Sequence, residues 1–387
     1  MNLEGKAPAI SPLANDLQLA GAFLISIVSL AVTPFPENLM KRMHPMHLIK
    51  STALLAALGL SATTVSAQEI TLRFQHFVSP ASANPTYFMQ PWADTIEEQS
   101  EGRIKVELYP FMQLGGSAPN QFDLIRDGAI DGGWVIPGYQ PNRFPEAEAM
   151  ELPFMTSKSG EEASAAAWEF TQEYLMDDFA DVHVIAAHMH GPGIVHKRGA
   201  SVETVEDFAG LKLRGPSRPA TLLLEELGAT PIGMPVPQFP EALSRGVVDG
   251  GVITWEMSPS LKLDELTDSH TDVAGDQALY NLYFIWAMNK DVYEGMPDDL
   301  RAIIDANSGM MASMWAGRAH DTGDVVGRDL MAADGNEIAQ LSEGETDRIK
   351  ALGADVTAAW IVEMDAKGYD GAALVGSAQA AVAANAN

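Results

Sequence analysis

Two segments far apart in the chain share one pattern. Residues 123–134 read Asp-Leu-Ile-Arg-Asp-Gly-Ala-Ile-Asp-Gly-Gly-Trp, and residues 241–252 read Glu-Ala-Leu-Ser-Arg-Gly-Val-Val-Asp-Gly-Gly-Val. Each predicts the end of a helix, a glycine that terminates it (Gly128 or Gly246), and a buried strand after Asp-Gly-Gly. A helix that ends at glycine before a strand is common, but a repeated Asp-Gly-Gly at the same offset is not. One copy in each half of the chain indicates two similar α/β lobes.

The ends of the repeated segments point to the place where a ligand would bind. Strands alternate with helices along the chain, which favours parallel α/β units, and in such units the strand ends face a crevice that commonly holds the ligand. Trp134 ends the first repeat and Tyr139 follows it, whereas Trp255 and Glu256 follow the second. Taken singly, a tryptophan is more often a core residue and a glutamate a solvated one. If the two lobes face each other, these four residues line one cleft.

A short segment of the second half offers a candidate anion-binding residue. Residues 210–219 read Gly-Leu-Lys-Leu-Arg-Gly-Pro-Ser-Arg-Pro. The alternation predicts a strand with Leu211 and Leu213 on its buried face, and then a helix over residues 216–227. Arg214 ends that strand, and its guanidinium can form two parallel hydrogen bonds with a carboxylate. The alternative is a surface arginine paired with an acid.

The composition narrows the class of protein. The 387 residues are 47% apolar, which is enough for a large core. The absence of cysteine excludes disulfides, thiolate metal sites and a cysteine nucleophile. The formal net charge of -28 would repel phosphates, so we expect no nucleic-acid partner.

The N-terminal residues read as a targeting segment. Residues 43–67 combine a weakly basic start, an apolar run and the small-residue end Val65-Ser66-Ala67, which is typical of a cleaved secretory signal peptide. Residues 1–42 precede it and hold another short apolar stretch. Because signal peptides begin at the chain start, we interpret residues 1–42 as an upstream extension outside the fold, with translation beginning at Met43 or Met46; an N-terminal anchor is the alternative.

The sequence lacks the common signatures of enzymes. It contains no Gly-x-Ser-x-Gly, no His-Glu-x-x-His, no Walker loop and no dinucleotide fingerprint. His188 and His190 lie two residues apart on a predicted strand and could bind a metal, although such histidines are more often structural. We include His190 among the candidate ligand-binding residues.

A series of short motifs carries a family resemblance. They are Gly102-Arg103-Ile104 with Tyr109-Pro110, Gln113-Leu114-Gly115-Gly116, Arg143-Phe144-Pro145 with Leu152-Pro153-Phe154, Gly210-Leu211-Lys212-Leu213-Arg214, Leu227-Gly228-Ala229-Thr230-Pro231, Ala242-Leu243 through Gly246-Val247-Val248-Asp249-Gly250, and Met288-Asn289-Lys290. Each motif alone is common, but the set in this order is specific. Over residues 69–370 the chain resembles the DctP-type solute-binding proteins of TRAP (tripartite ATP-independent periplasmic) transporters.

The resemblance implies a fold, a location and partners. The fold is the two-lobed α/β fold of periplasmic binding proteins, with hinge strands and a long helix that spans both lobes. We place lobe I in residues 69–190 with 280–318, and lobe II in residues 191–279 with 319–380. A protein of this kind is not an enzyme. It works in the periplasm and delivers its ligand to the small and large membrane subunits of a permease driven by an ion gradient rather than ATP.

The resemblance also implies a site that binds a small organic acid, whose carboxylate pairs with Arg214. The other candidate ligand-binding residues are His76, Gln113, Trp134, Phe154, His190, Trp255 and Glu256. Many relatives carry Gln-Glu-Asn after the second Asp-Gly, where this chain has residues 251–253, Gly-Val-Ile. The difference disfavours sialic acids and simple dicarboxylates, and favours a monocarboxylate with an apolar, aromatic or keto body. In some relatives an acid near this place helps to hold a cation, so a Na⁺ or Ca²⁺ ion beside the ligand at Glu256 is a further expectation.

Other classes of protein stay open at this point. A binding protein of an ATP-driven importer or a sensor would have the same two lobes. A periplasmic enzyme acting on organic acids would need a nucleophile, a metal or an acid–base pair, none of which the sequence indicates. A structural or adhesive role would leave the Arg214 strand and the repeated segments unexplained.

Overall fold

The computed structural model of the chain describes residues 69–386. The predicted upstream extension (residues 1–42) and signal peptide (residues 43–67) lie outside the described residues. Within residues 69–386, no helix is both long and apolar enough to cross a membrane.

The first sheet has five strands in the order β2-β1-β3-β10-β4. Its strands are β1 (Ile70–Gln75), β2 (Ile104–Tyr109), β3 (Gly132–Val135), β4 (Val182–Met189) and β10 (Tyr283–Asn289). β1 runs parallel to β2 and β3, whereas β10 runs antiparallel to β3 and β4. The sheet is therefore mixed rather than purely parallel, because β10 enters it from the opposite direction.

The second sheet repeats this arrangement with six strands in the order β11-β9-β5-β8-β6-β7. Its strands are β5 (Gly193–Lys197), β6 (Lys212–Gly215), β7 (Thr230–Gly233), β8 (Gly250–Thr254), β9 (Ser269–Asp272) and β11 (Glu337–Gln340). β6 is parallel to β7 and β8, and β5 is antiparallel to β8 and β9. Each sheet thus contains one strand that runs against both of its neighbours.

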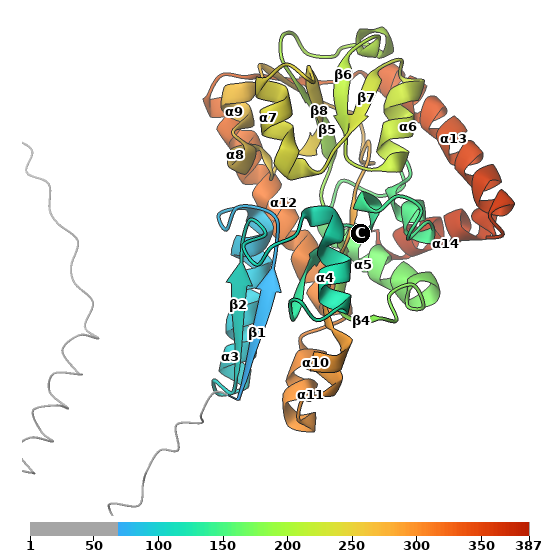
Figure 1. The fold of residues 1–387 in the computed structure, drawn as a ribbon. Helices are drawn as coiled ribbons and strands as arrows, with labels where there is room; N and C mark the ends of the chain where they lie inside the picture. The colour runs from blue at the N-terminus through green and yellow to red at the C-terminus, as the bar shows by residue number, and fades with distance from the viewer. Residues whose placement is uncertain (1–68, 387) are drawn as a thin grey trace, which may run out of the picture. The chain divides into compact units, whose positions relative to one another are not determined.

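The chain crosses between the sheets through short connections. Only residues 190–192 separate β4 of the first sheet from β5 of the second, and residues 273–282 lead back from β9 to β10. In Figure 1, β5–β8 with their helices form the upper part, and β1, β2 and β4 lie in the lower part. The two-lobed fold predicted from the sequence is confirmed, while the residue boundaries of the lobes stay a prediction.

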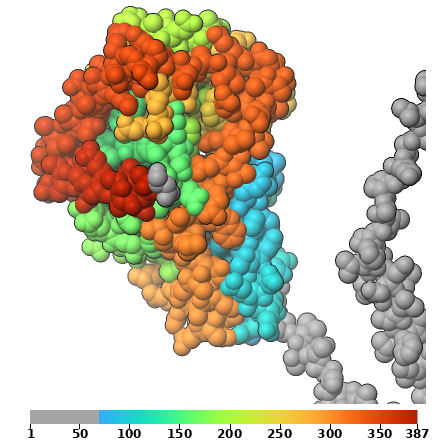
Figure 2. Space-filling model, turned by 180° about the vertical axis from the view of Figure 1, so that it is seen from behind, coloured from blue at the N-terminus to red at the C-terminus, as the bar shows by residue number. Residues whose placement is uncertain are grey.

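The helices cover the sheets and link them. They are α3 (Gln90–Gln99), α4 (Gln121–Arg126), α5 (Gly160–Phe170), α6 (Arg218–Glu226), α7 (Phe239–Ser244), α8 (Ser258–Leu261), α9 (Leu263–Leu266), α10 (Lys290–Glu294), α11 (Asp298–Ala306), α12 (Met310–Ala333), α13 (Glu343–Ala366) and α14 (Gly371–Asn385). α13 packs against α6, and α14 packs against α5. Figure 2 shows α13 and α14 in red beside the orange band that includes α12.

The repeated Asp-Gly-Gly segments have the same structural role in both sheets. Gly128 and Gly246 end their helices with positive φ angles of 70° and 69°. Asp131 then accepts a hydrogen bond from the backbone N–H of Arg73 on β1, at 2.8 Å. Asp249 accepts the equivalent bond from the N–H of Lys212 on β6, at 2.9 Å. Each aspartate thereby fixes its strand against the parallel neighbour.

The helix after β6 begins later than the sequence suggested. Ser217 is still extended, with φ -140°, and α6 begins at Arg218. Pro219 rather than Pro216 therefore lies in the first turn. Backbone N–H groups in the first turn have no acceptor within the helix, so proline, which lacks the N–H, loses no hydrogen bond there. The shift leaves residues 215–217 as a non-helical link between Arg214 and α6.

The long helix α12 is built to touch both sheets closely. It packs against α5 and β4 at one end, and against α8, α9 and β11 at the other. A Cβ atom at Gly317 would overlap the carbonyl oxygen of Gly160, and one at Gly327 would overlap that of Trp255. Glycine is required at these positions because a backbone atom of the neighbouring segment occupies the side-chain space.

We predict that Gly327→Ala lowers the free energy of unfolding by about 1–3 kcal/mol, because the methyl group overlaps the backbone of Trp255. The control is Gly376→Ala on the exposed side of α14, where an added Cβ meets no atom within 4 Å. That substitution should raise stability by up to about 1 kcal/mol through helix propensity. Urea unfolding measures both, and equal changes in the two variants would contradict the close packing of α12.

Candidate ligand-binding site

A cavity lies where segments of the two sheets meet. Residues of the first sheet and its loops and residues of the second both line it. The lining residues are Phe77, Val78, Trp134, Ile136, Tyr139, His190, Arg214, Val236, Ile253, Thr254, Glu256, Met257, Tyr280, Leu282 and Phe284. The mostly apolar lining with a few polar groups is of the kind that binds small organic molecules.

The charged group at one side of the cavity is Arg214. β6 carries it next to β8, and Gly251 opposite makes room, because a Cβ there would lie 2.7 Å from the Cβ of Arg214. Its Nε donates to the carbonyl oxygen of Met234 and its Nη1 to that of Val252, both at 3.0 Å. The repeated Asp-Gly-Gly therefore also provides the space in which the arginine sits.

The remaining edge of this guanidinium has no partner. Arg214 is 1% exposed, and its Nη2 is buried without a hydrogen bond. No carboxylate within residues 69–386 forms a salt bridge with it. Burying a cation without an anion costs free energy. An anionic group bound at this edge, which the described residues do not supply, would lower that cost.

Tyr139 adds a hydroxyl near the arginine. Its oxygen accepts a hydrogen bond from the N–H of Val236 at 3.0 Å, which leaves its proton available to a ligand. Burial raises the pKa of Tyr139, and the positive charge of Arg214 works in the opposite direction. Tyr139 therefore stays a neutral donor at physiological pH.

Flat aromatic rings form a wall of the cavity. Trp134 stacks on Phe77 with ring centroids 4.9 Å apart and planes 1° from parallel. Trp134 also stacks on Phe284, with ring centroids 4.8 Å apart and planes 13° from parallel. Tyr139 and Tyr280 complete the aromatic lining. A planar apolar ligand body is complementary to such a surface.

His190 lines the cavity without offering it a polar atom. Its Nε2 accepts from the N–H of Leu282 at 3.0 Å, so the proton is on Nδ1, which lies 2.6 Å from the carbonyl oxygen of Gly191. Burial lowers the pKa of His190 to about 3. Because both ring nitrogens form hydrogen bonds with backbone groups, His190 contributes only the uncharged carbon face of its ring to the cavity.

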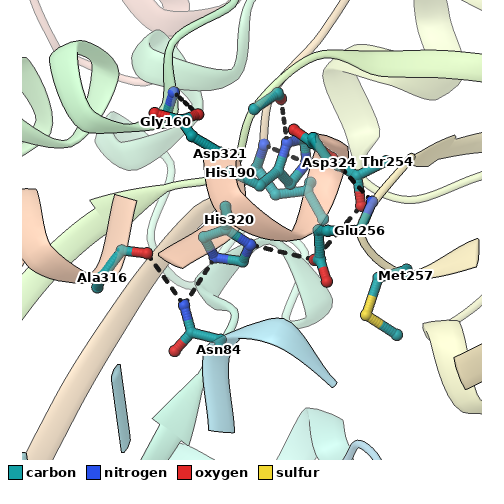
Figure 3. A network of polar contacts seen from close by, with 12 residues as sticks. Asn84, Gly160, His190, Thr254, Glu256, Met257, Ala316, His320, Asp321 and Asp324 are labelled. Carbon is teal, nitrogen blue, oxygen red and sulfur yellow. Dashed lines mark hydrogen bonds and ion pairs between the residues drawn. The ribbon is translucent and has the colours of Figure 1, made fainter. Parts of the chain in front are cut away.

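Glu256 is held by a network that reaches α12 (Figure 3). Asn84 donates to the carbonyl of Ala316 and lies 3.0 Å from Nε2 of His320. Since the amide donates there, the His320 proton is on Nδ1, which donates to Oε1 of Glu256 at 3.1 Å. The backbone N–H of Glu256 donates to Asp324 at 2.8 Å. The network fixes the orientation of the Glu256 carboxylate.

Asp324 lies beside this carboxylate on the same face of α12 as His320. Burial, and after it the charge of Glu256, raises the pKa of Asp324 well above its ordinary value. Burial and the neighbouring carboxylate of Glu256 therefore both disfavour the charged form of this aspartate. Sequence reasoning missed His320 and Asp324, although their spacing of four residues on a helix could have placed them together.

Four of the eight candidate residues line the cavity: Trp134, His190, Arg214 and Glu256. Sequence reasoning missed Phe77, Tyr280 and Phe284 as lining residues, because Tyr280 and Phe284 lie in an apolar run that reads as core and Phe77 belongs to no motif. The ligand-binding roles of all eight candidates stay predictions.

The other four candidates lie elsewhere in the structure. Trp255 is buried against the rings of His196 and His270, each with its centroid 5.5 Å away. Phe154 packs under the ammonium group of Lys350. Gln113 is exposed. His76 is buried, and burial lowers its pKa to about 4.

The described residues contain no group of three or more His, Cys, Asp or Glu side chains that could hold a metal ion. The paired histidines His188 and His190 do not form such a group. Nε2 of His188 accepts instead from the indole N–H of Trp134 at 2.8 Å. A cation at Glu256 stays a prediction.

Comparison with known proteins agrees with this architecture. The family model for bacterial extracellular solute-binding protein, family 7 (DctP), matches residues 74–362. The chain belongs to the DctP family of solute-binding proteins. Members are binding receptors rather than enzymes, so the chain is a receptor of the TRAP type, as the sequence motifs predicted.

Solved structures of DctP-family proteins give the same result. A TRAP solute-binding protein from Rhodoferax ferrireducens, in complex with copurified benzoate, is 42% identical with a TM-score of 0.79, covering 81% of this chain and 98% of that one. A marine metagenome protein with 3-hydroxybenzoate is 40% identical with a TM-score of 0.81, covering 83% and 100%. Among sequence relatives, the outer membrane transporter protein TsaT of Comamonas testosteroni is 24% identical over 340 residues, covering 87% of this chain and 97% of its own length.

A buried acid next to the cavity gives a pH-dependent prediction. Glu151 accepts a hydrogen bond from the N–H of Tyr283 at 2.9 Å, and burial raises its pKa to about 8. Between the ordinary pKa of a glutamate and pH 8, the folded state keeps a proton that the unfolded state has released. Stability therefore falls as pH rises through this window, by up to about 1.4 kcal/mol per pH unit.

We predict that Glu151→Gln removes this loss, so that the variant gains stability over the unmodified protein as pH rises from 5 to 8. Urea unfolding at each pH measures the difference, and other buried groups cancel in the comparison. Glu97→Gln, at an exposed position of α3, is the matched control and should show no such trend. A difference between Glu151→Gln and the unmodified protein that does not change with pH would contradict the prediction.

Proposed function

We propose that the protein captures a small aromatic monocarboxylate in the cavity between its two sheets and delivers it to a membrane permease. The observation that carries the proposal is the buried Arg214, whose Nη2 has no partner within the described residues. A carboxylate at this edge would receive charge-assisted hydrogen bonds and neutralise the buried charge. Tyr139 would donate a further hydrogen bond to the same group.

The shape and charge of the cavity support one carboxylate on a flat body. The stacked rings of Phe77, Trp134 and Phe284 suit an aromatic or similarly planar group. Arg214 is the one arginine or lysine among the residues that line the cavity, so a second carboxylate would have no cationic partner. A monocarboxylate is therefore favoured over a dicarboxylate or a sialic acid.

The ligands of DctP-family proteins support the same class. The Rhodoferax protein was solved with benzoate and the metagenome protein with 3-hydroxybenzoate. A protein from Bordetella bronchiseptica, 29% identical, was solved with both enantiomers of mandelate. All three are aromatic monocarboxylates.

Closure around the ligand would use contacts between the two parts of the fold. Arg218, at the start of α6, donates to Glu148 of the first part at 2.7 Å and also pairs with Glu363 of α13. The same oxygen of Glu148 accepts from the indole N–H of Trp360 at 2.8 Å. These contacts would hold α6 and the adjoining Arg214 strand against the first sheet when the cavity is shut.

The proposed partners are the small and large membrane subunits of a TRAP permease driven by an ion gradient. The proposed location is the periplasm, reached through cleavage of the signal peptide in residues 43–67. Membership of the DctP family supports both proposals.

We predict that Arg214→Ala weakens benzoate binding by about 2–5 kcal/mol, because the ligand carboxylate loses its buried cationic partner. Isothermal titration calorimetry with benzoate measures the effect. Arg245→Ala, at an exposed position, is the matched control and should bind as the unmodified protein does. Circular dichroism confirms that each variant is folded.

Arg214→Lys extends the same test. Lysine keeps the charge but loses the planar pair of donors, so its affinity should lie between those of the alanine variant and the unmodified protein. If Arg214→Ala binds benzoate within a few-fold of the unmodified protein, the carboxylate does not bind at Arg214.

A further inference from the structure

The cavity contains a second polar group with an unused hydrogen-bonding atom. Glu256 lines the cavity and is 5% exposed. Its Oε1 accepts from Nδ1 of His320 at 3.1 Å and lies 3.4 Å from the hydroxyl of Thr254. Its Oε2 is buried and has no hydrogen-bond partner in the described part of the chain.

None of the surrounding residues donates a hydrogen bond to this oxygen. The amide of Asn84 fixes the proton of His320 on the nitrogen that already serves Oε1 (Figure 3). Asp324 is engaged through Oδ1 with the backbone N–H of Glu256, and its Oδ2 makes no hydrogen bond. His190 uses both ring nitrogens on the backbone. Oε2 of Glu256 is therefore an acceptor without a donor, on a residue that lines the cavity.

We infer that Oε2 of Glu256 accepts a hydrogen bond from a hydroxyl group on the body of the ligand, so that the protein prefers hydroxylated aromatic monocarboxylates to unsubstituted ones. The inference rests on the proposed function, because it assumes that Arg214 binds the ligand carboxylate. Arg214 then binds the carboxylate at one end of the ligand, and Glu256 binds the hydroxyl group at the other.

The chemistry of the cavity favours a hydroxyl over other groups. A second carboxylate would meet the like charge of Glu256. An ammonium group would bring three donors and a positive charge into a cavity that already holds the buried guanidinium of Arg214. A hydroxyl brings one donor, adds no charge and can accept from Thr254. An unsubstituted ring leaves Oε2 buried and unpaired, which is unfavourable.

The test compares ligands that differ in one group. Dissociation constants are measured by calorimetry for benzoate, for ortho-, meta- and para-hydroxybenzoate, and for the three methylbenzoates, which have similar size but no donor. We expect at least one hydroxybenzoate to bind about tenfold or more tightly than both benzoate and its methyl counterpart. If no hydroxybenzoate has this advantage while benzoate binds, the inference is wrong and the proposed function stands.

A variant of Glu256 tests whether this residue causes the preference for hydroxybenzoates. In Glu256→Gln the amide oxygen can still accept from His320, but an N–H₂ group replaces Oε2. The advantage of the preferred hydroxybenzoate over its methyl counterpart should fall to about threefold or less. Glu97→Gln on the surface is the control and should keep the full ratio. A ratio that survives Glu256→Gln would overturn the assignment.

Two further outcomes distinguish a failure of the proposed function from a failure of the hydroxyl inference. If none of the acids binds, the proposed function itself fails. If added Na⁺ or Ca²⁺ strengthens benzoate binding and abolishes the advantage of the hydroxybenzoates, a cation occupies the place beside Oε2, and the hydroxyl inference is overturned.

Discussion

The structure around the cavity depends on one buried charge. The guanidinium of Arg214 is held on one side by the carbonyl oxygens of Met234 and Val252, while its Nη2 has no partner in the described chain. Removing a cation from water without an anion is unfavourable, so the fold around it must be stabilised elsewhere. The extensive apolar core of the two sheets provides that stabilisation, and the incoming acid completes the polar contacts that folding leaves unmade.

The other polar groups of the cavity are arranged so that they do not compete for this role. The nitrogens of His190 are used by the backbone, and the proton of His320 is directed to Glu256. Burial keeps His190 neutral and raises the pKa of Asp324. The charges that remain are therefore few and lie at defined places, which allows a mostly apolar cavity to distinguish the ends of its ligand.

Local signals in the sequence were sufficient for the architecture and for its central residue. Glycine after a helix, Asp-Gly-Gly and a short alternating strand predicted the paired lobes and Arg214, because each depends on neighbours in the chain. The aromatic wall was only partly predictable: Trp134 ends a repeat, but Phe284 lies in an apolar run that any core strand would show, and Phe77 belongs to no motif. His320 lies 64 residues from its partner Glu256, and no local pattern indicates that contact. Contacts of this kind come from tertiary packing.

The glycine positions of α12 have a consequence for motion. At Gly317 and Gly327 the helix backbone lies directly against carbonyl groups of the neighbouring segments, with no flexible side chain between them. Sliding of the helix along either part would drive backbone into backbone, whereas a small rotation about these contacts would not. The helix is therefore seated against both parts without slack, so neither part can slide along it unless these backbone contacts are first broken.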